Sequence, residues 1–321
     1  MKIKFNIIKL LRVPVLMFIL SIFGTALFAQ ETDISVEKVT HKAVKNTFES
    51  VWIIDNQTVM VPVQSTFEFD IQHRFGNVNN NGVNDLWGLF APSNIRLGFG
   101  YAPINNLFLG AGLTKDRMII DGSAKYALFK QTADSWAMPV SITFYGNISY
   151  DAVKDPDNGL YKHKTDRWRF FNELIIARKF TDRFSVQVAP SISHQNFVQG
   201  YVKQTDVLVK EVAPEMDHEH FAISVSGRYK ITDGMAFMLN YDQPITKHYS
   251  NNPNPNLSFG FEFGTSGHSF QIFAGNYSFL NPQRNNIFNK NSPLEYTDAQ
   301  NVFHKGGNFM IGFNITRLWN L

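Results

Sequence analysis

The chain has 321 residues, 14% of them aromatic, with 30 phenylalanines and no cysteine. Without cysteine it can form no disulfide, no lipid-modified cysteine, no cysteine-ligated zinc site and no covalent attachment to c-type haem. The formal net charge is +3 and falls to near zero once residues 1–29 are removed, so the mature chain gives no electrostatic basis for binding nucleic acid.

Residues 1–29 have the pattern of a secretory signal peptide. An apolar stretch, residues 13–23, is followed by small residues up to Ala29, and we expect cleavage after Ala29. A retained membrane anchor is the alternative, because the apolar N-terminal region could just span a bilayer. The basic residues ahead of the apolar stretch are Lys2, Lys4, Lys9 and Arg12. Their removal takes the 30 Lys and Arg to 26 against 27 Asp and Glu, so the mature chain is close to neutral.

Residues 30–63 differ from the rest of the chain. They open with a polar stretch and then contain two short apolar runs, 51–54 and 59–62, around an Asp-Asn-Gln turn. The segment could be an N-terminal periplasmic extension, a plug inside the barrel predicted downstream, or an extra strand pair. We favour the extension or the plug.

From residue 64 onward, apolar and polar residues alternate. In 221–231, for example, Phe221, Ile223 and Val225 share one face of a strand, because successive side chains point to opposite faces. About twelve such segments are bounded by Gly, Pro, Asn and Asp clusters. They are 66–75, 94–101, 107–113, 117–129, 140–150, 168–180, 184–193, 221–231, 235–242, 257–264, 270–277 and 308–319.

The connections between these segments sort by length. Short links such as 103–106 and 181–183 follow every second strand. Most of the others are long and polar, with 114–116 as the exception: 76–92, 151–165, 196–217, 246–256 and 279–306. Short periplasmic turns alternating with longer extracellular loops are typical of outer-membrane barrels. After the signal, no apolar run is as long as a spanning helix.

The fold prediction is therefore all-β: a transmembrane antiparallel up-and-down β-barrel of about twelve strands, formed by residues 64–321 after a cleaved signal peptide. The predicted location is the outer membrane of a Gram-negative bacterium.

Four sequence runs carry a family resemblance. Two are Ser65-Thr-Phe-Glu-Phe-Asp-Ile-Gln-His-Arg-Phe-Gly76 and Asn94-Ile-Arg-Leu-Gly-Phe-Gly-Tyr101; the others are Leu109-Gly-Ala-Gly112 and Asp121-Gly-Ser-Ala-Lys-Tyr126. Together they resemble an uncharacterised outer-membrane β-barrel family of Bacteroidetes, known only as a domain of unknown function. The resemblance is most specific over residues 47–131. It implies an exported barrel of about this size and brings no established activity or catalytic residues.

Charged residues on the polar faces are the first candidate site. We expect them to line the lumen, either as a water-filled constriction that selects solutes or as a self-neutralising network that fills it, since buried charges must be paired. A twelve-stranded barrel lies between the filled eight-stranded and the open sixteen-stranded ones. The candidates are Glu68, Asp70, Arg74, Arg96, Asp121, Lys125, Arg167, Arg169, Glu173, Arg228, Asp242 and Glu262.

Two histidines are the second candidate. His218 and His220 are two apart, so on a strand both imidazoles face the same way, here inward near the extracellular mouth. With Glu215 or Asp217 they could begin a zinc or copper site. Solvated histidines at a loop edge are the alternative, and we predict no metal or other cofactor.

Hydrolysis is the third possibility. The sequence has no Gly-x-Ser-x-Gly elbow. Ser193, His194 and Asn196 lie together, but neighbouring residues on a strand point to opposite faces, so nothing predicts triad geometry. We therefore predict a protein that is not an enzyme.

The function predicted from these features is passive passage of small hydrophilic solutes through a charged lumen. The alternative is a closed structural or docking barrel that acts through its long extracellular loops, especially 196–217 and 279–306. The predicted partners are outer-membrane lipid, small polar solutes and the barrel-assembly machinery, and no nucleic acid.

Overall fold

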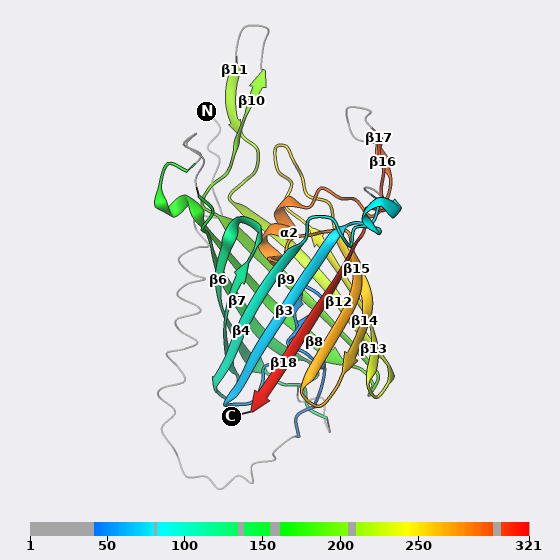
Figure 1. Cartoon of the computed structure of the whole chain (residues 1–321). Helices are drawn as coiled ribbons and strands as arrows, with labels where there is room; N and C mark the ends of the chain where they lie inside the picture. The colour runs from blue at the N-terminus through cyan, green and yellow to red at the C-terminus, as the bar shows by residue number, and fades with distance from the viewer. Residues whose placement is uncertain are drawn as a thin grey trace, which may run out of the picture. The chain divides into compact units, whose positions relative to one another are not determined.

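Twelve antiparallel strands among the described residues form a closed barrel (Figure 1). Each pairs with the next barrel strand along the chain, and β18 pairs with β3 to close the sheet. The barrel strands are β3 (Thr66–Asn77), β4 (Asn94–Ile104), β5 (Leu107–Thr114), β6 (Ile119–Phe129), β7 (Ser141–Asp151), β8 (Trp168–Lys179), β9 (Phe184–Gln195), β12 (Glu219–Thr232), β13 (Met235–Pro244), β14 (Asn256–Gly264), β15 (His268–Gly275) and β18 (Met310–Asn320). The predicted barrel and its strand number are confirmed.

The computed structural model describes residues 42–79, 82–133, 138–154, 161–204, 210–297 and 303–320. All of these lie in one compact unit, residues 41–321. The predicted signal peptide, residues 1–29, lies outside the described residues.

The two-residue alternation places apolar side chains on the outer face of the barrel. On β12, Phe221, Ile223 and Val225 are exposed, whereas the intervening Ala222 and Ser224 are buried. A closed sheet has no unpaired edge, so every strand can present its apolar face outward and its polar face to the lumen. The strand phase read from the sequence is therefore correct.

The two ends of the barrel differ. The "turn end" carries links such as Asn105–Asn106 and the C-terminus, whereas the "loop end" carries the longer connections (Figure 1). In the described part of the chain, no helix is long and apolar enough to cross a membrane. The loop end contains α2 (Pro282–Phe288), the hairpin β10 (Gly200–Gln204) with β11 (Lys210–Pro214), the strand pair β16 (Tyr296–Thr297) and β17 (Phe303–His304), and the 3-10 helices Gly82–Asp85, Asp116–Met118 and Lys164–Arg167.

The segment that precedes β3 enters the lumen. β1 (Trp52–Ile53) pairs with β2 (Asn56–Gln57) as a short antiparallel hairpin that joins no barrel strand. We call residues 47–60 the lumen hairpin. At the turn end the segment is held to the barrel by an isolated bridge between Ala43 and Thr132. The hairpin is thus tethered at one end of the barrel and reaches toward the other.

Candidate functional site

Barrel side chains hold the backbone of the lumen hairpin. Gln271 uses both amide atoms: its Nε2 donates to the Trp52 carbonyl at 2.9 Å, and its Oε1 accepts from the Ile54 N–H at 3.1 Å. The Thr143 hydroxyl donates to the Val59 carbonyl at 2.9 Å. Buried backbone groups must be hydrogen-bonded. The hairpin backbone pairs with no barrel strand, so side chains of the barrel supply these hydrogen bonds instead.

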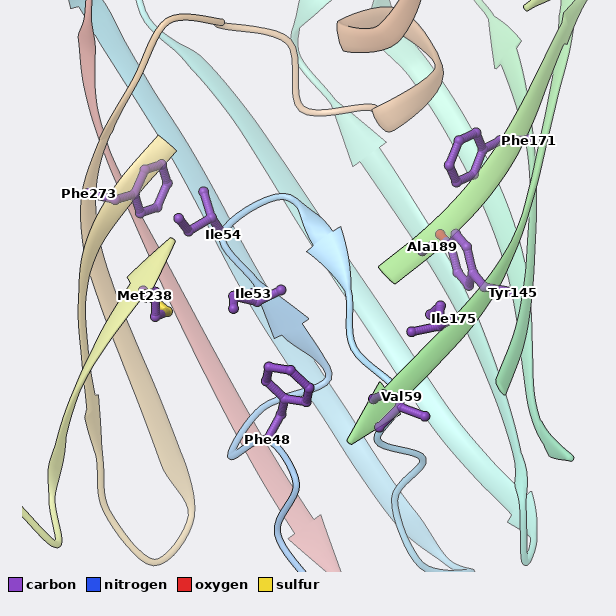
Figure 2. Close-up of a cluster of buried hydrophobic side chains, with 11 residues drawn as sticks. Phe48, Ile53, Ile54, Val59, Tyr145, Phe171, Ile175, Ala189, Met238 and Phe273 are labelled. Atoms are coloured by element: carbon purple, nitrogen blue, oxygen red, sulfur yellow. The ribbon is translucent and has the colours of Figure 1, made fainter. Parts of the chain in front are cut away.

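Apolar contacts support the hairpin from both sides. Figure 2 shows its residues Phe48, Ile53, Ile54 and Val59 among inward-facing side chains of the barrel wall. Burial of each large apolar side chain contributes about 1.5–3 kcal/mol, so the cluster stabilises the filled lumen. The barrel residues in the cluster are Tyr145, Phe171, Ile175, Ala177, Ala189, Met238 and Phe273.

Polar side chains fix the register of the hairpin in the lumen. Asn56 donates from Nδ2 to Asn240 at 2.8 Å and to the Asp242 carboxylate at 2.7 Å. Lys125 donates from Nζ to Gln57 Oε1 at 3.0 Å on another part of the wall. Two predicted lumen charges, Asp242 and Lys125, therefore bind the hairpin directly.

The tip of the hairpin contacts the loop end. Ile54 has a φ of +61°, a left-handed conformation that is unfavourable for a β-branched residue. The next residue, Asp55, accepts a hydrogen bond from the Tyr277 hydroxyl and another from Asn285 Nδ2 at 3.0 Å. Asn285 belongs to α2, so the tip of the hairpin and the loop-end helix are in direct contact.

Arg96 is the centre of a buried charge network. Its guanidinium lies 3.1 Å from Asp70 and 2.9 Å from Asp121. Two glycines make room for it: a Cβ at Gly98 would lie 1.8 Å from the Asp70 carboxylate, and one at Gly112 would lie 2.2 Å from Arg96. Gly98 and Gly112 thus allow close packing around the Arg96 network.

Ten of the twelve predicted lumen charges are buried in the barrel interior. Arg228 is half-buried and pairs with Glu262 through Nε at 2.6 Å, while Arg74 lies over the Phe273 ring at 4.5 Å. Several of these charges pair with one another or with the hairpin, as Arg96 does with Asp70 and Lys125 does with Gln57. The ten are Glu68, Asp70, Arg74, Arg96, Asp121, Lys125, Arg169, Glu173, Asp242 and Glu262.

The expected inward position of Arg167 on a strand is wrong. Arg167 ends the 3-10 helix before β8, and its Nη1 donates to the carbonyls of Asp151 at 2.9 Å and Val153 at 2.6 Å. The strand begins one residue later, so the alternation does not extend to Arg167.

The shared orientation expected for His218 and His220 is also wrong. β12 begins at Glu219, so His218 precedes the strand; its Nδ1 lies 2.7 Å from the Gln195 carbonyl. His220 is buried, and its Nδ1 lies 2.9 Å from Nε2 of His248. Within the described residues, no group of three or more His, Cys, Asp or Glu side chains could hold a metal ion.

Sequence reasoning missed the apolar residues that face inward. A signal for them exists, because two consecutive apolar residues on a strand place one on each face. Phe170 and Phe171 form such a pair, and Ile175 and Ile176 another; Phe171 and Ile175 are the buried members. These doublets indicate a lumen that contains protein.

The family described as membrane bound beta barrel domain (DUF5777) matches residues 48–319. The chain belongs to this family. The match confirms the family resemblance of the sequence. It includes the lumen hairpin from residue 48 onward and all of the barrel strands except the last residue of β18. No curated protein sequence is detectably similar to the chain.

Several solved barrels are similar to the chain at low identity. The NanC porin is 9% identical, with 79% of this chain and 99% of that chain covered and a TM-score of 0.44. An outer-membrane channel from Pseudomonas putida F1 is 10% identical, with coverages of 81% and 97% and a TM-score of 0.40. The Ralstonia pickettii toluene transporter TbuX is 8% identical, with coverages of 82% and 91% and a TM-score of 0.40. The identities and TM-scores are too low for the substrate of any of these proteins to be assigned to this chain.

Closed antiparallel barrels with an even strand number and an apolar outer face are the architecture of bacterial outer-membrane proteins. This family member has all of these features, and it is a protein of the Gram-negative outer membrane. Its turn end is accordingly periplasmic and its loop end extracellular, and its outer face contacts membrane lipid.

Proposed function

We propose that the protein is a channel for small hydrophilic solutes whose gate is the lumen hairpin. The observation that supports this most strongly is the way the hairpin is held. In the described structure its own backbone makes no ladder with the barrel, and its bonds to the wall run through side chains such as Gln271 and Thr143. The hairpin can therefore leave without unpairing a barrel strand.

The wall that the hairpin covers is polar. Gln187 donates to the Gln57 carbonyl at 2.7 Å, and Asp242 and Lys125 bind the hairpin as described above. Once the hairpin moves, water replaces its groups on these side chains, and a hydrated pathway with charges of both signs results. The filled lumen is the closed state of such a channel.

Single-channel conductance in a planar bilayer tests the proposal. We expect the folded full-length chain to be closed for most of the time. A variant that lacks residues 47–60 should give steady open steps, and Gln271→Ala, which removes two bonds to the hairpin, should open more often than the wild type. Gln64→Ala, at an exposed glutamine of the turn end, is the matched control.

A deletion variant that migrates as a folded barrel on unheated gels and still conducts nothing would contradict the gate. That result favours the alternative, a closed barrel that docks partners through its extracellular loops. The proposed function needs no catalysis. Small polar solutes and the barrel-assembly machinery stay predicted partners.

A further inference from the structure

A cavity of about 250 Å³ lies at the extracellular end of the barrel, apart from the hairpin. We call it the vestibule cavity. Its lining residues come from the barrel strands β8 and β9, from the extracellular connections and from α2. Three arginines and three aromatic residues define its character: Arg117, Arg169, Arg284, Tyr161, Phe197 and Phe288.

Arg169, which lines this cavity, has hydrogen-bond donors without a partner. Its side chain is 9% exposed, and neither Nε nor Nη1 has a hydrogen-bond partner. The Asp151 carboxylate lies 3.6 Å from Nη1, beyond hydrogen-bond distance. A buried donor without a partner costs about 1–3 kcal/mol, more for a charged group. The arginine therefore has hydrogen-bonding capacity beyond its ion pair with Asp151.

The other two arginines are held in place by acidic residues. Arg117 pairs with Asp151 and donates from Nη2 to the Tyr161 hydroxyl at 2.6 Å. Arg284 pairs with Asp116, and its Nε has no hydrogen-bond partner. These ion pairs orient the guanidinium groups of Arg117 and Arg284. Donors on Arg169 and Arg284 have no hydrogen-bond partner.

One carboxylate also lines the cavity. Glu215 accepts a hydrogen bond from Asn251 Nδ2 at 2.9 Å, so this carboxylate already has a partner. The positive groups lie close enough to affect one another: burial lowers the pKa of Arg284, and the charges of Arg169 and Arg117 lower it further, while Asp116 raises it. An added anion relieves this repulsion.

The aromatic residues shape the rest of the wall. Tyr161 and Phe197 meet edge to face with their ring centroids 5.3 Å apart, and the Arg284 guanidinium lies 5.9 Å from the centre of the Phe288 ring. Flat apolar faces of this kind bind the face of a sugar or an aromatic ring. The cavity volume is below the range of drug-sized sites, which limits the occupant to about one ring.

We propose that the vestibule cavity binds a small ring-sized organic anion, with its carboxylate or phosphate on Arg169 and Arg284 and its ring against Tyr161, Phe197 and Phe288. An arginine fork matches two oxygens of such a group. The proposal concerns binding and holds whether or not the hairpin opens, so a silent barrel leaves it intact.

Isothermal titration of the folded full-length protein in detergent tests the site. The probes are glucuronate for a carboxylate, glucose 6-phosphate for a phosphate, and glucose as the neutral sugar. We expect at least one of the two anions to bind ten times or more tightly than glucose. Arg169→Gln should weaken that binding by roughly tenfold or more, whereas Arg183→Gln, at an exposed arginine of the periplasmic end, should leave it unchanged.

A second variant keeps the test valid if Arg169→Gln, which changes a buried residue, fails to fold. Gln199 is exposed and lines the cavity, so Gln199→Glu adds a negative charge without disturbing the core and should weaken anion binding. The proposal is overturned if neither anion is preferred over glucose. It is equally overturned if Gln199→Glu, and Arg169→Gln where it folds, bind the anion like the wild type.

Discussion

The Tyr277 hydroxyl donates a hydrogen bond to the carboxylate of Asp55, 222 residues away in sequence. Asp55 is at the tip of the lumen hairpin, and Tyr277 follows β15 at the extracellular end. The hairpin is tethered at the periplasmic end by Ala43, so this contact joins the free end of the gate to the extracellular loops.

The first prediction concerns this contact. Tyr277→Phe removes the donor and leaves a buried carboxylate with one bond fewer, a cost of about 1–3 kcal/mol to the closed state. In single-channel recordings we expect the ratio of open to closed time to rise by roughly 5- to 150-fold. Tyr249→Phe, at a tyrosine that is 69% exposed, should behave like the wild type. Equal gating in both variants would show that the tip contact does not hold the gate.

The second prediction uses the depth of residues on β12. Val225 faces outward at the middle of the strand and Ile231 faces outward near its periplasmic end. Val225→Arg should destabilise the folded barrel by about 2–4 kcal/mol, and Ile231→Arg by about 0–1 kcal/mol. Reversible urea unfolding in lipid vesicles measures both values. Similar losses at the two sites would contradict the assigned membrane position.

The third prediction concerns the charge network in the lumen. Arg96→Met leaves the buried carboxylates of Asp70 and Asp121 without their shared cation, and this should cost about 3–5 kcal/mol of unfolding free energy. Replacing both carboxylates as well, by Asp70→Asn and Asp121→Asn, should recover a large part of the loss. Urea unfolding of the single and triple variants measures this recovery. If the loss in Arg96→Met came from packing and not from the uncompensated carboxylates, the triple variant would be as unstable as the single variant.

The fourth prediction is a pH dependence at the extracellular loops. Nδ1 of His248 accepts the Asp217 N–H at 3.1 Å, which requires a neutral ring. Burial lowers the pKa of His248 below its ordinary 6.5; nearby Asp217 raises it and Lys290 lowers it. Because the folded state disfavours protonation, the contribution of His248 is present above pH 6.5 and is lost as the pH falls through the lowered pKa.

Thermal unfolding as a function of pH checks this sign. The advantage of the wild type over His248→Gln should be about 1 kcal/mol at pH 7.5 and should shrink as the pH falls below 6.5. His163→Gln, at an exposed histidine, is the control and should track the wild type. An advantage that grows on acidification would reverse the assigned sign.

Local alternation was sufficient to predict the barrel wall. The outward position of Val225, the burial of Ser226 and the number of strands all follow from a period of two, because that period is a property of the extended backbone itself. It failed at Arg167 and His218, because each of these residues lies just before its strand and the alternation does not extend to it. A boundary depends on where hydrogen bonds to the neighbouring strand begin, and the sequence of one strand does not contain that information.

The sequence by itself determined that the chain closes into a lipid-facing barrel with polar residues inside. Only the tertiary structure decided what those residues bind. Arg96 meets Asp70 and Asp121 because of the registers of β3, β4, β5 and β6, and Gln271 meets Trp52 because the barrel is wide enough to admit a hairpin. The width of the barrel depends on the number of strands, and the register depends on the stagger between them around the closed sheet. The contacts inside the lumen are therefore fixed only when the barrel closes.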